Sequence, residues 1–181
     1  MSVHDSVHRT GDPACEVAHA PVASGQAAGE RTLVAVFASP VAGYLLRYGA
    51  DLGYHVLLVE PGHDRASAAA MLGFGVSESM PDDLDELADV VVTDHHRDEL
   101  GIALRDALGT KARWIGVMGS PRHTGPHVAA LTSLGVAEHD IARVHRPIGL
   151  NIGSRTPPEI AIATLAGLLA DRNGRSGGLH F

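Results

Sequence analysis

The chain has 181 residues, which is enough for one domain with a sizeable hydrophobic core. Its formal net charge is −7 and its 14 Lys and Arg residues form no basic run, which argues against nucleic acid and anionic membrane surfaces as partners. No stretch approaches the ~20 apolar residues that span a bilayer and no apolar signal core is present, so we expect a cytoplasmic protein.

The chain divides into an arm, a domain and a tail. Residues 1–30 are rich in small and polar residues without helical or strand periodicity, so we expect a flexible arm there. Residues 31–175 alternate short, continuous apolar runs with helical patterns, followed by a tail over 176–181. Continuous runs are typical of strands covered on both faces. The predicted strands are 33–37, 55–59, 89–92 and 114–118, and the helical patterns are 41–52, 66–72, part of 84–88, 98–108 and 126–134. This alternation predicts a single α/β domain, a doubly wound, Rossmann-like parallel sheet with helices on both faces.

A last helix is predicted to begin at about Pro157. Thr156 and Glu159 have the spacing of a capping box, and a proline in the first turn needs no amide. The helix is expected to end near Asn173. Its faces are nearly all apolar or alanine, which predicts a buried helix.

The stretch before this helix is glycine-rich. Gly149 and Gly153 bracket Asn151, and glycines let backbone amides approach a ligand closely. Arg155 lies beside the helix N-terminus, so the local field suits a phosphate group. The alternative interpretation is a tight loop that leads into a well-capped helix.

In such a sheet, ligands bind beyond the carboxyl ends of the strands. Ala38 and Pro40, after the first strand, stand where a dinucleotide-binding turn has glycines, so NAD(P) is not an expected cofactor. Ser39 is a candidate helix cap and crevice residue. Glu60, after the second strand, is placed either to hold ribose hydroxyls or to act as a strand-end carboxylate in a turn.

The third and fourth strands lead into further polar residues. Thr93, His95 and His96 follow the third strand and are candidate ligand contacts, but adjacent histidines cannot share one ion, so we predict no metal site there. Ser120 and Arg122 follow the fourth strand and are expected at the same edge of the sheet.

Several enzyme classes lack the residues they need. The only lysine, Lys111, is neither in a glycine-rich P-loop nor four places after a tyrosine, which excludes P-loop phosphoryl transfer and short-chain dehydrogenase chemistry. The single cysteine, Cys15, lies in the predicted arm, and no Gly-x-Ser-x-Gly elbow occurs. We therefore expect a binding protein, with no catalytic residue assigned.

Two segments resemble a known family. The run Trp114-Ile-Gly-Val-Met-Gly-Ser120 and the run from Arg143 to Ala161 are similar to the C-terminal Rossmann domain of the xanthine dehydrogenase accessory (XdhC/CoxI) family. The resemblance implies a chaperone-like accessory protein that binds molybdenum cofactor (molybdopterin) for a molybdenum hydroxylase such as xanthine dehydrogenase. It implies as partners the hydroxylase apoenzyme or a separate XdhC N-terminal-type protein, with a homodimer left open. The alternatives are an NAD(P)-dependent oxidoreductase and a ligand-free Rossmann interaction module.

Overall fold

Strands and helices alternate along the chain in the computed structural model, which describes residues 30–70, 73–120 and 125–178. The elements are β1 (Thr32–Val36), α2 (Pro40–Asp51), β2 (His55–Val59), α3 (His63–Ala70), β3 (Gly75–Ser77), β4 (Ala88–Val92), α4 (Leu100–Leu108), β5 (Trp114–Val117), α5 (Pro126–Ser133), α6 (Glu138–Ile141), β6 (Val144–His145) and α7 (Pro157–Arg172). Except for residue 30, the predicted arm lies outside the described residues, as do residues 179–181 of the tail.

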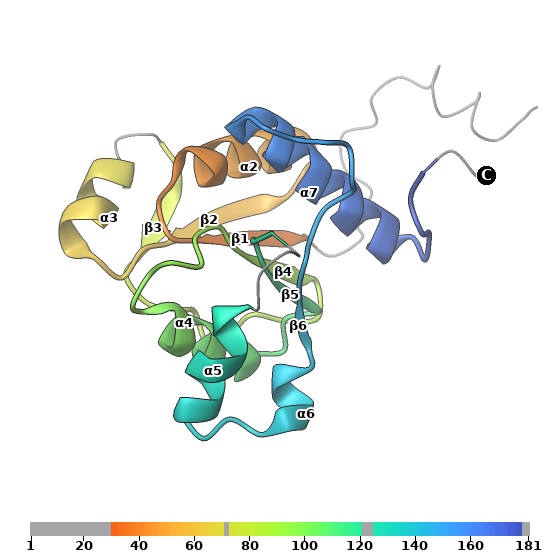
Figure 1. Ribbon diagram of the computed structural model, residues 1–181. Coiled ribbons are helices and arrows are strands. Elements are labelled where there is room, and N and C mark those ends of the chain that lie inside the picture. Colours follow the sequence, from red (N-terminus) through yellow and green to blue (C-terminus); the bar gives the residue numbers. More distant parts are fainter. Residues whose placement is uncertain (1–29, 71–72, 121–124, 179–181) are drawn as a thin grey trace, which may run out of the picture.

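All six strands form one parallel sheet in the order β3-β2-β1-β4-β5-β6 (Figure 1). The chain leaves β1 in one direction across the sheet and returns to build the other half from β4, so the topological switch point lies between β1 and β4. The predicted Rossmann-like α/β fold is confirmed. A ligand is therefore expected at the carboxyl ends of β1 and β4.

Two hydrophobic cores lie on the two faces of the sheet. Side chains alternate along β1: Leu33 and Ala35 pack with α2 and α7, while Val34 and Val36 pack with α4. Figure 1 shows α2 and α7 on one face and α4 and α5 on the other. The strands are thus continuously apolar for the predicted reason, because helices cover both faces of the sheet.

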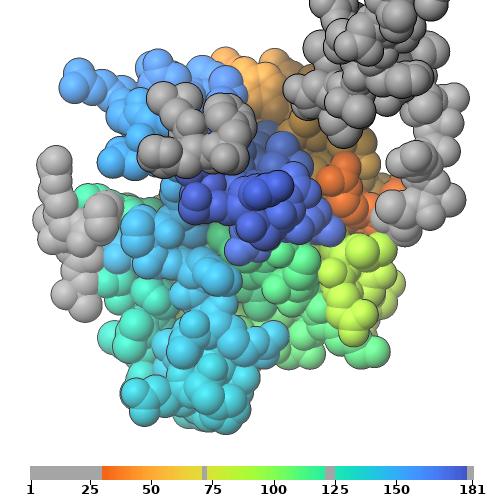
Figure 2. All heavy atoms as spheres, turned by 90° about the vertical axis from the view of Figure 1, so that its right-hand side faces the viewer, coloured from red at the N-terminus to blue at the C-terminus, as the bar shows by residue number. Residues whose placement is uncertain are grey.

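The capped helix begins where the sequence predicts. In α7 Pro157 is the first residue, and Thr156 and Glu159 form the capping box. One side of the helix packs on α2 and the sheet, but Ile162 is 52% exposed and Figure 2 shows the later part of α7 at the surface. The helix is therefore covered on one side and open on the other, not enclosed as predicted.

The other differences from the prediction involve short elements. No helix forms over 84–88, where the chain makes turns, and α4 begins at Leu100 instead of residue 98. The strands β3 and β6 and the helix α6 are two to four residues long and were not predicted. Elements this short give no readable periodicity. None of the helices over the described ranges is long and apolar enough to cross a membrane.

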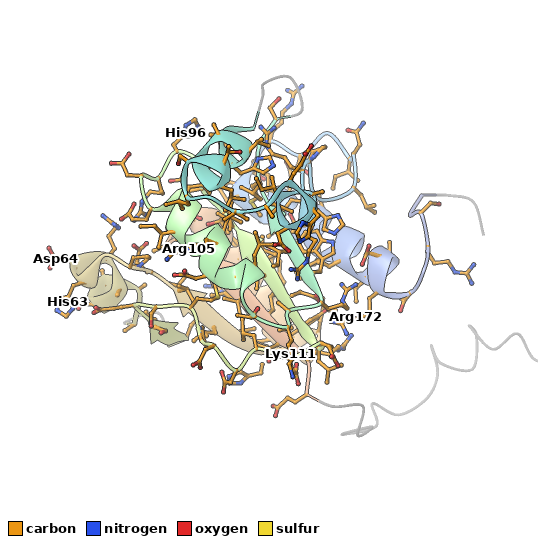
Figure 3. All side chains as sticks on the ribbon, turned by 90° about the horizontal axis from the view of Figure 1, so that it is seen from below. His63, Asp64, His96, Arg105, Lys111 and Arg172 are labelled. Carbon is orange, nitrogen blue, oxygen red and sulfur yellow. The ribbon has the colours of Figure 1, made fainter. Side chains whose placement is uncertain are left out.

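A buried ion-pair cluster lies at the amino ends of the strands, opposite the ligand edge. Asp89 is fully buried at the start of β4, with Arg113 Nη2 at 2.8 Å from one carboxylate oxygen and Arg172 Nη2 at 2.9 Å from the other. Arg113 also pairs with Asp171 of α7. Figure 3 shows Arg172 well apart from His96, which follows β4 at the other end of the sheet. The cluster joins β4, β5 and the end of α7.

Candidate functional site

The turns that follow β1 and β4 are hydrogen-bonded to each other at the switch point. Ser39 Oγ caps α2 by accepting from the amide of Ala42 at 3.0 Å, and it lies 3.0 Å from Thr93 Oγ1. Thr93 has one hydroxyl proton, and its Oγ1 lies 2.8 Å from the carbonyl of Phe37. Ser39 must therefore donate to Thr93, and Thr93 to Phe37. Two predicted site residues, Ser39 and Thr93, are thus in direct contact.

Phe37 occupies the position of the tight turn after β1. Its φ of +73° lies in the left-handed region that favours glycine. The conformation is held by its amide, which donates to the carbonyl of Val59 at 2.8 Å, and by the fully buried ring. The guanidinium of Arg97 covers that ring at 4.6 Å from the centroid. A buried phenylalanine, directly before Ala38, therefore adopts a backbone conformation that favours glycine.

The carboxylate of Glu60 is fully buried and saturated with donors. It accepts from the amides of Ala38 at 2.8 Å and Gly62 at 2.9 Å, from Arg65 Nε at 3.0 Å and from Arg97 Nη2 at 2.9 Å. Desolvation by burial raises its pKa, but these hydrogen bonds, Arg97's first, outweigh it and lower the pKa from 4.5 to about 2. Glu60 thus holds the turn after β1 by accepting a hydrogen bond from the amide of Ala38.

Glu99 completes a four-residue network with Glu60 and the two arginines. Its Oε1 lies 3.2 Å from Nη2 of both Arg65 and Arg97. The hydrogen bond to Glu60 is the main reason that the pKa of Arg97 is raised, and the hydrogen bond from Arg97 lowers the pKa of Glu99. The network fixes Arg97 between the turns after β2 and β4.

One pocket of about 500 Å³ opens beside this network, and we call it the histidine pocket. It is lined by His95, His96, Arg97, Asp98, Leu100, Pro126, Ala130 and Arg146. The rings of His95 and His96 lie 4.0 Å apart between centroids. Burial, and then the charges of His96 and Arg146, lower the pKa of His95, so its ring is neutral near pH 7.

Arg146 extends the pocket to the end of β5. Its Nη2 donates to the carbonyl of Ser120 at 2.9 Å, and its guanidinium lies against Gly119. Of the predicted site residues, His95, His96 and Ser120 are therefore gathered around one arginine. The predicted contact Arg122 lies outside the described residues.

A second pocket of about 460 Å³ lies between α2 and α3, and we call it the α2 pocket. It is lined by Ala38, Ser39, Pro40, Gly43, Tyr44, Arg47, Arg65, Ala68 and Ala69. Arg65 belongs both to this lining and to the network around Glu60. The network therefore separates the two pockets, with Arg97 on one side and Arg65 on the other.

The glycine-rich loop before α7 lies apart from both pockets. A Cβ on Gly149 would come within 3.1 Å of the backbone of Ala163, and the next amide, that of Leu150, donates to the Ala163 carbonyl at 2.9 Å. Glu159 accepts from the amides of Arg155 at 2.7 Å and Thr156 at 3.0 Å, so a carboxylate already occupies the start of α7. Asn151, Gly153 and Arg155 are exposed. The structure thus accounts for Gly149 by packing against α7.

A family model described as the XdhC Rossmann domain matches residues 33–168. The chain belongs to this family. The predicted resemblance is confirmed over most of the region that the structure describes.

Two relatives have longer chains than this one. The uncharacterized protein YqeB of Escherichia coli K12 is 43% identical over 77 residues, which are 42% of this chain and 14% of that protein. A crystal structure titled as a xanthine dehydrogenase from Bacillus halodurans superposes with a TM-score of 0.63 over 81% of this chain and 44% of that one. At 19% identity this second likeness concerns the fold. The chain spans less than half of either relative.

Sequence reasoning missed the arginines that organise the site. Arg97 pairs with Glu60 across 37 positions of sequence, and Arg146 reaches the histidine pocket only because β6 places it beside β5. One signal could have found Arg146, since an arginine directly after a strand in an α/β domain lies at the ligand edge. Using this signal requires knowing that Arg146 follows a strand, and the two-residue strand β6 is too short for the sequence pattern to reveal.

Metal binding by the paired histidines remains untested. No group of three or more His, Cys, Asp or Glu side chains suited to a metal ion occurs among residues 30–70, 73–120 and 125–178. The amide of His96 donates to Asp94 at 2.9 Å, which holds the turn after β4. The prediction that no metal binds here therefore still awaits measurement.

We expect the XdhC domain to bind NAD(H) and NADP(H) weakly or not at all. Pro40 supplies no amide to a pyrophosphate, the amide of Ala38 is taken by Glu60, and the Glu60 carboxylate has no lone pair left for a ribose. Isothermal titration calorimetry measures this directly. A dissociation constant at or below roughly 10 µM, about −7 kcal/mol, would support the oxidoreductase alternative instead.

Proposed function

We propose that this XdhC-family chain is a non-catalytic accessory protein that binds molybdenum cofactor and presents it to a molybdenum hydroxylase apoenzyme such as xanthine dehydrogenase. The family supports the accessory role. The observation that carries the proposal for the ligand is the histidine pocket, where two arginines and two histidines line one cavity at the ligand edge of the sheet. This role would be carried out in the cytoplasm.

The charge of the pocket suits a phosphate-bearing pterin. The lining carries two cations, Arg97, which is paired with Glu60 and Glu99 behind the pocket, and Arg146, and Asp98 is the one carboxylate among the lining residues that the structure describes. Guanidinium groups bind phosphate with paired hydrogen bonds, and the neutral imidazole of His95 can donate a hydrogen bond to a carbonyl or ring nitrogen and accept one from a ring N–H. A volume of about 500 Å³ is within the usual range for small-molecule sites. The residues present therefore fit the group.

The arginines are also held in place before any ligand arrives. Arg97 is anchored by Glu60 and stacked on Phe37, and Arg146 is hydrogen-bonded to Ser120. Preorganised side chains lose little conformational entropy on binding, which favours retention of the ligand. Retention suits a protein that holds a labile cofactor for transfer. The cofactor supplies the redox chemistry of the acceptor enzyme, and this chain binds and orients it.

The experiment is retention of the cofactor through purification. The wild-type chain and Arg146→Ala are expressed in a molybdate-replete host, and molybdenum is measured by mass spectrometry and pterin by fluorescence after oxidation. We expect both to co-elute with the wild-type protein and to be reduced roughly tenfold or more in Arg146→Ala, because a hydrogen bond to a charged group is lost. Wild-type protein that elutes without pterin would contradict the proposal.

A further inference from the structure

The first turn of α5 has no side-chain cap in the described part of the chain. α2 has Ser39 as its cap and α7 has a capping box, but α5 follows Gly125 and no side chain bonds to its start. Its first residue is Pro126, which has no amide, so the first amides are those of His127 and Val128. Neither amide has an acceptor within the described ranges. The start of α5 therefore presents unpaired donors and the positive end of a helix dipole.

A buried histidine nitrogen faces the same helix start. His127 is only 8% exposed, and its Nδ1 has no hydrogen-bond partner among the described residues. A Cβ built on Gly125 would lie 2.4 Å from both Nδ1 and Cε1, so this edge of the ring is turned back toward the first turn. Buried polar atoms are nearly always hydrogen-bonded, and an unpaired one needs an explanation. The unpaired Nδ1 therefore indicates a binding partner.

Arg146 brings a positive charge to this point from the end of β6. A Cβ on Gly125 would lie 3.1 Å from its Cδ, and one on Gly119 would lie 2.7 Å from its Nη2. Both glycines thus make room for the side chain of Arg146. Burial, and then the charge of Arg146, lower the pKa of His127, so this ring is neutral near pH 7. A neutral imidazole has one proton, and it can donate a hydrogen bond from Nδ1.

The groups that converge here are donors of three kinds. The amides of His127 and Val128 and the guanidinium of Arg146 can only donate, and the imidazole can donate as well. Such a set suits an anion that accepts several hydrogen bonds, and phosphate groups bind at helix starts for the same reason. A phosphate monoester offers three terminal oxygens, one for each kind of donor. The convergence therefore favours a phosphate monoester over a neutral ligand.

This helix start borders the histidine pocket. Pro126 and Arg146 belong to the pocket lining, together with His95 and His96, whereas His127 does not. Figure 3 shows His96 beside α5. A ligand with its phosphate on the first turn of α5 therefore has room for its ring toward the paired imidazoles.

We propose that the first turn of α5, His127 and Arg146 form the phosphate site of the histidine pocket. The phosphate accepts from the amides of His127 and Val128, from Nδ1 of His127 and from the guanidinium of Arg146. That the phosphate belongs to a pterin cofactor rests on the proposed function. The phosphate site itself rests on the helix start and the buried imidazole, so it can be tested without the cofactor.

Inorganic phosphate is the probe, and its binding is followed by amide NMR spectra of the isotopically labelled wild-type chain. We expect the amide signals of His127 and Val128 to shift with added phosphate until they saturate. The amide of Thr156 is the control, because the start of α7 already has the Glu159 carboxylate as its acceptor. Sodium chloride at the same ionic strength should not reproduce the shifts, since screening acts on charges without occupying a site.

His127→Leu removes the imidazole nitrogens and keeps an apolar side chain of similar size. We expect it to weaken phosphate binding roughly tenfold or more, because a hydrogen bond to a charged group is lost. The Tm should not fall, since an unpaired buried nitrogen is replaced by carbon. His139→Leu is the matched control, because the side chain of His139 on α6 is 82% exposed, and this variant should bind phosphate as the wild type does.

Gly125→Ala tests the geometry of the helix start. The φ of −70° and ψ of 125° at Gly125 suit alanine, so the backbone is not strained. The new Cβ would instead displace the ring of His127 from the first turn of α5. We expect Gly125→Ala to weaken phosphate binding about as much as His127→Leu does.

Three results would each overturn the phosphate site. They are no saturable shift at His127 and Val128, shifts that sodium chloride reproduces, and wild-type affinity in both His127→Leu and Gly125→Ala. Pterin retention separates this inference from the proposed function. Phosphate binding at α5 with no pterin retained by the wild type would contradict only the proposed function. Equal pterin retention in His127→Leu and the wild type would place the phosphate of the cofactor elsewhere and overturn the inference.

Discussion

Asp89→Asn is expected to lower the free energy of unfolding by about 3–5 kcal/mol, the range for breaking a buried ion pair from one side. Asp89 is fully buried and both of its carboxylate oxygens pair with arginines, Arg113 and Arg172. The substitution leaves these guanidinium groups without their shared counter-charge. It also loosens the joint between β4, β5 and the end of α7.

Urea denaturation at pH 7 measures the effect, and Asp106→Asn is the control. Asp106 lies on α4, is 41% exposed and pairs with an equally open Arg105, so its loss should change stability by less than about 1 kcal/mol. If Asp89→Asn lowers the free energy of unfolding as little as Asp106→Asn does, Arg113 and Arg172 have found other partners. The ligand edge should keep its structure in any folded fraction, because the cluster is at the opposite end of the strands.

Glu60→Gln is expected to cost about 3 kcal/mol at pH 7, because a pKa lowered from 4.5 to about 2 is stabilisation of the folded state by the ionised carboxylate. The group is more acidic in the folded chain than in the unfolded one. Its contribution is therefore fully present above pH 4.5 and is lost as the pH falls toward 2. The variant keeps a buried amide but loses the charge that Arg65 and Arg97 face.

Unfolding free energies between pH 7 and pH 3 measure this contribution. The wild-type chain should lose more stability over that range than Glu60→Gln does, so the two curves converge at low pH. Glu86→Gln, at an exposed position before β4, should follow the wild-type curve. Parallel curves for the wild type and Glu60→Gln would mean that the Glu60 carboxylate does not cause the loss of stability at low pH.

The sequence predicted the elements that a local residue pattern identifies. The runs that became β1, β2, β4 and β5 are continuously apolar because both faces are covered, and the start of α7 was fixed by the Thr156 and Glu159 capping box. The pairing of Glu60 with Arg97 could not be read in the same way. Those residues are brought together only by the strand order, which no local pattern encodes.

The site was predicted in outline and differs in detail. Ser39 and Thr93 were expected at one edge of the sheet, and their hydroxyls are 3.0 Å apart. Glu60 was left open between a ribose contact and a strand-end carboxylate, and its contacts are those of the second. Gly149 was interpreted as a site of ligand approach, but what approaches it is the backbone of α7. A glycine indicates that some group lies close to the backbone, but it does not distinguish a ligand from another part of the chain.

Calorimetric titration of isolated molybdenum cofactor into the wild-type chain, Arg146→Ala and Arg155→Ala tests the central claim most directly. Arg146 lines the histidine pocket, whereas Arg155 is exposed in the loop before α7. We expect saturable binding to the wild type, a loss of about 1.5–3 kcal/mol in Arg146→Ala and little change in Arg155→Ala. Unchanged binding in Arg146→Ala with a loss in Arg155→Ala, or no binding to the wild type, would contradict it.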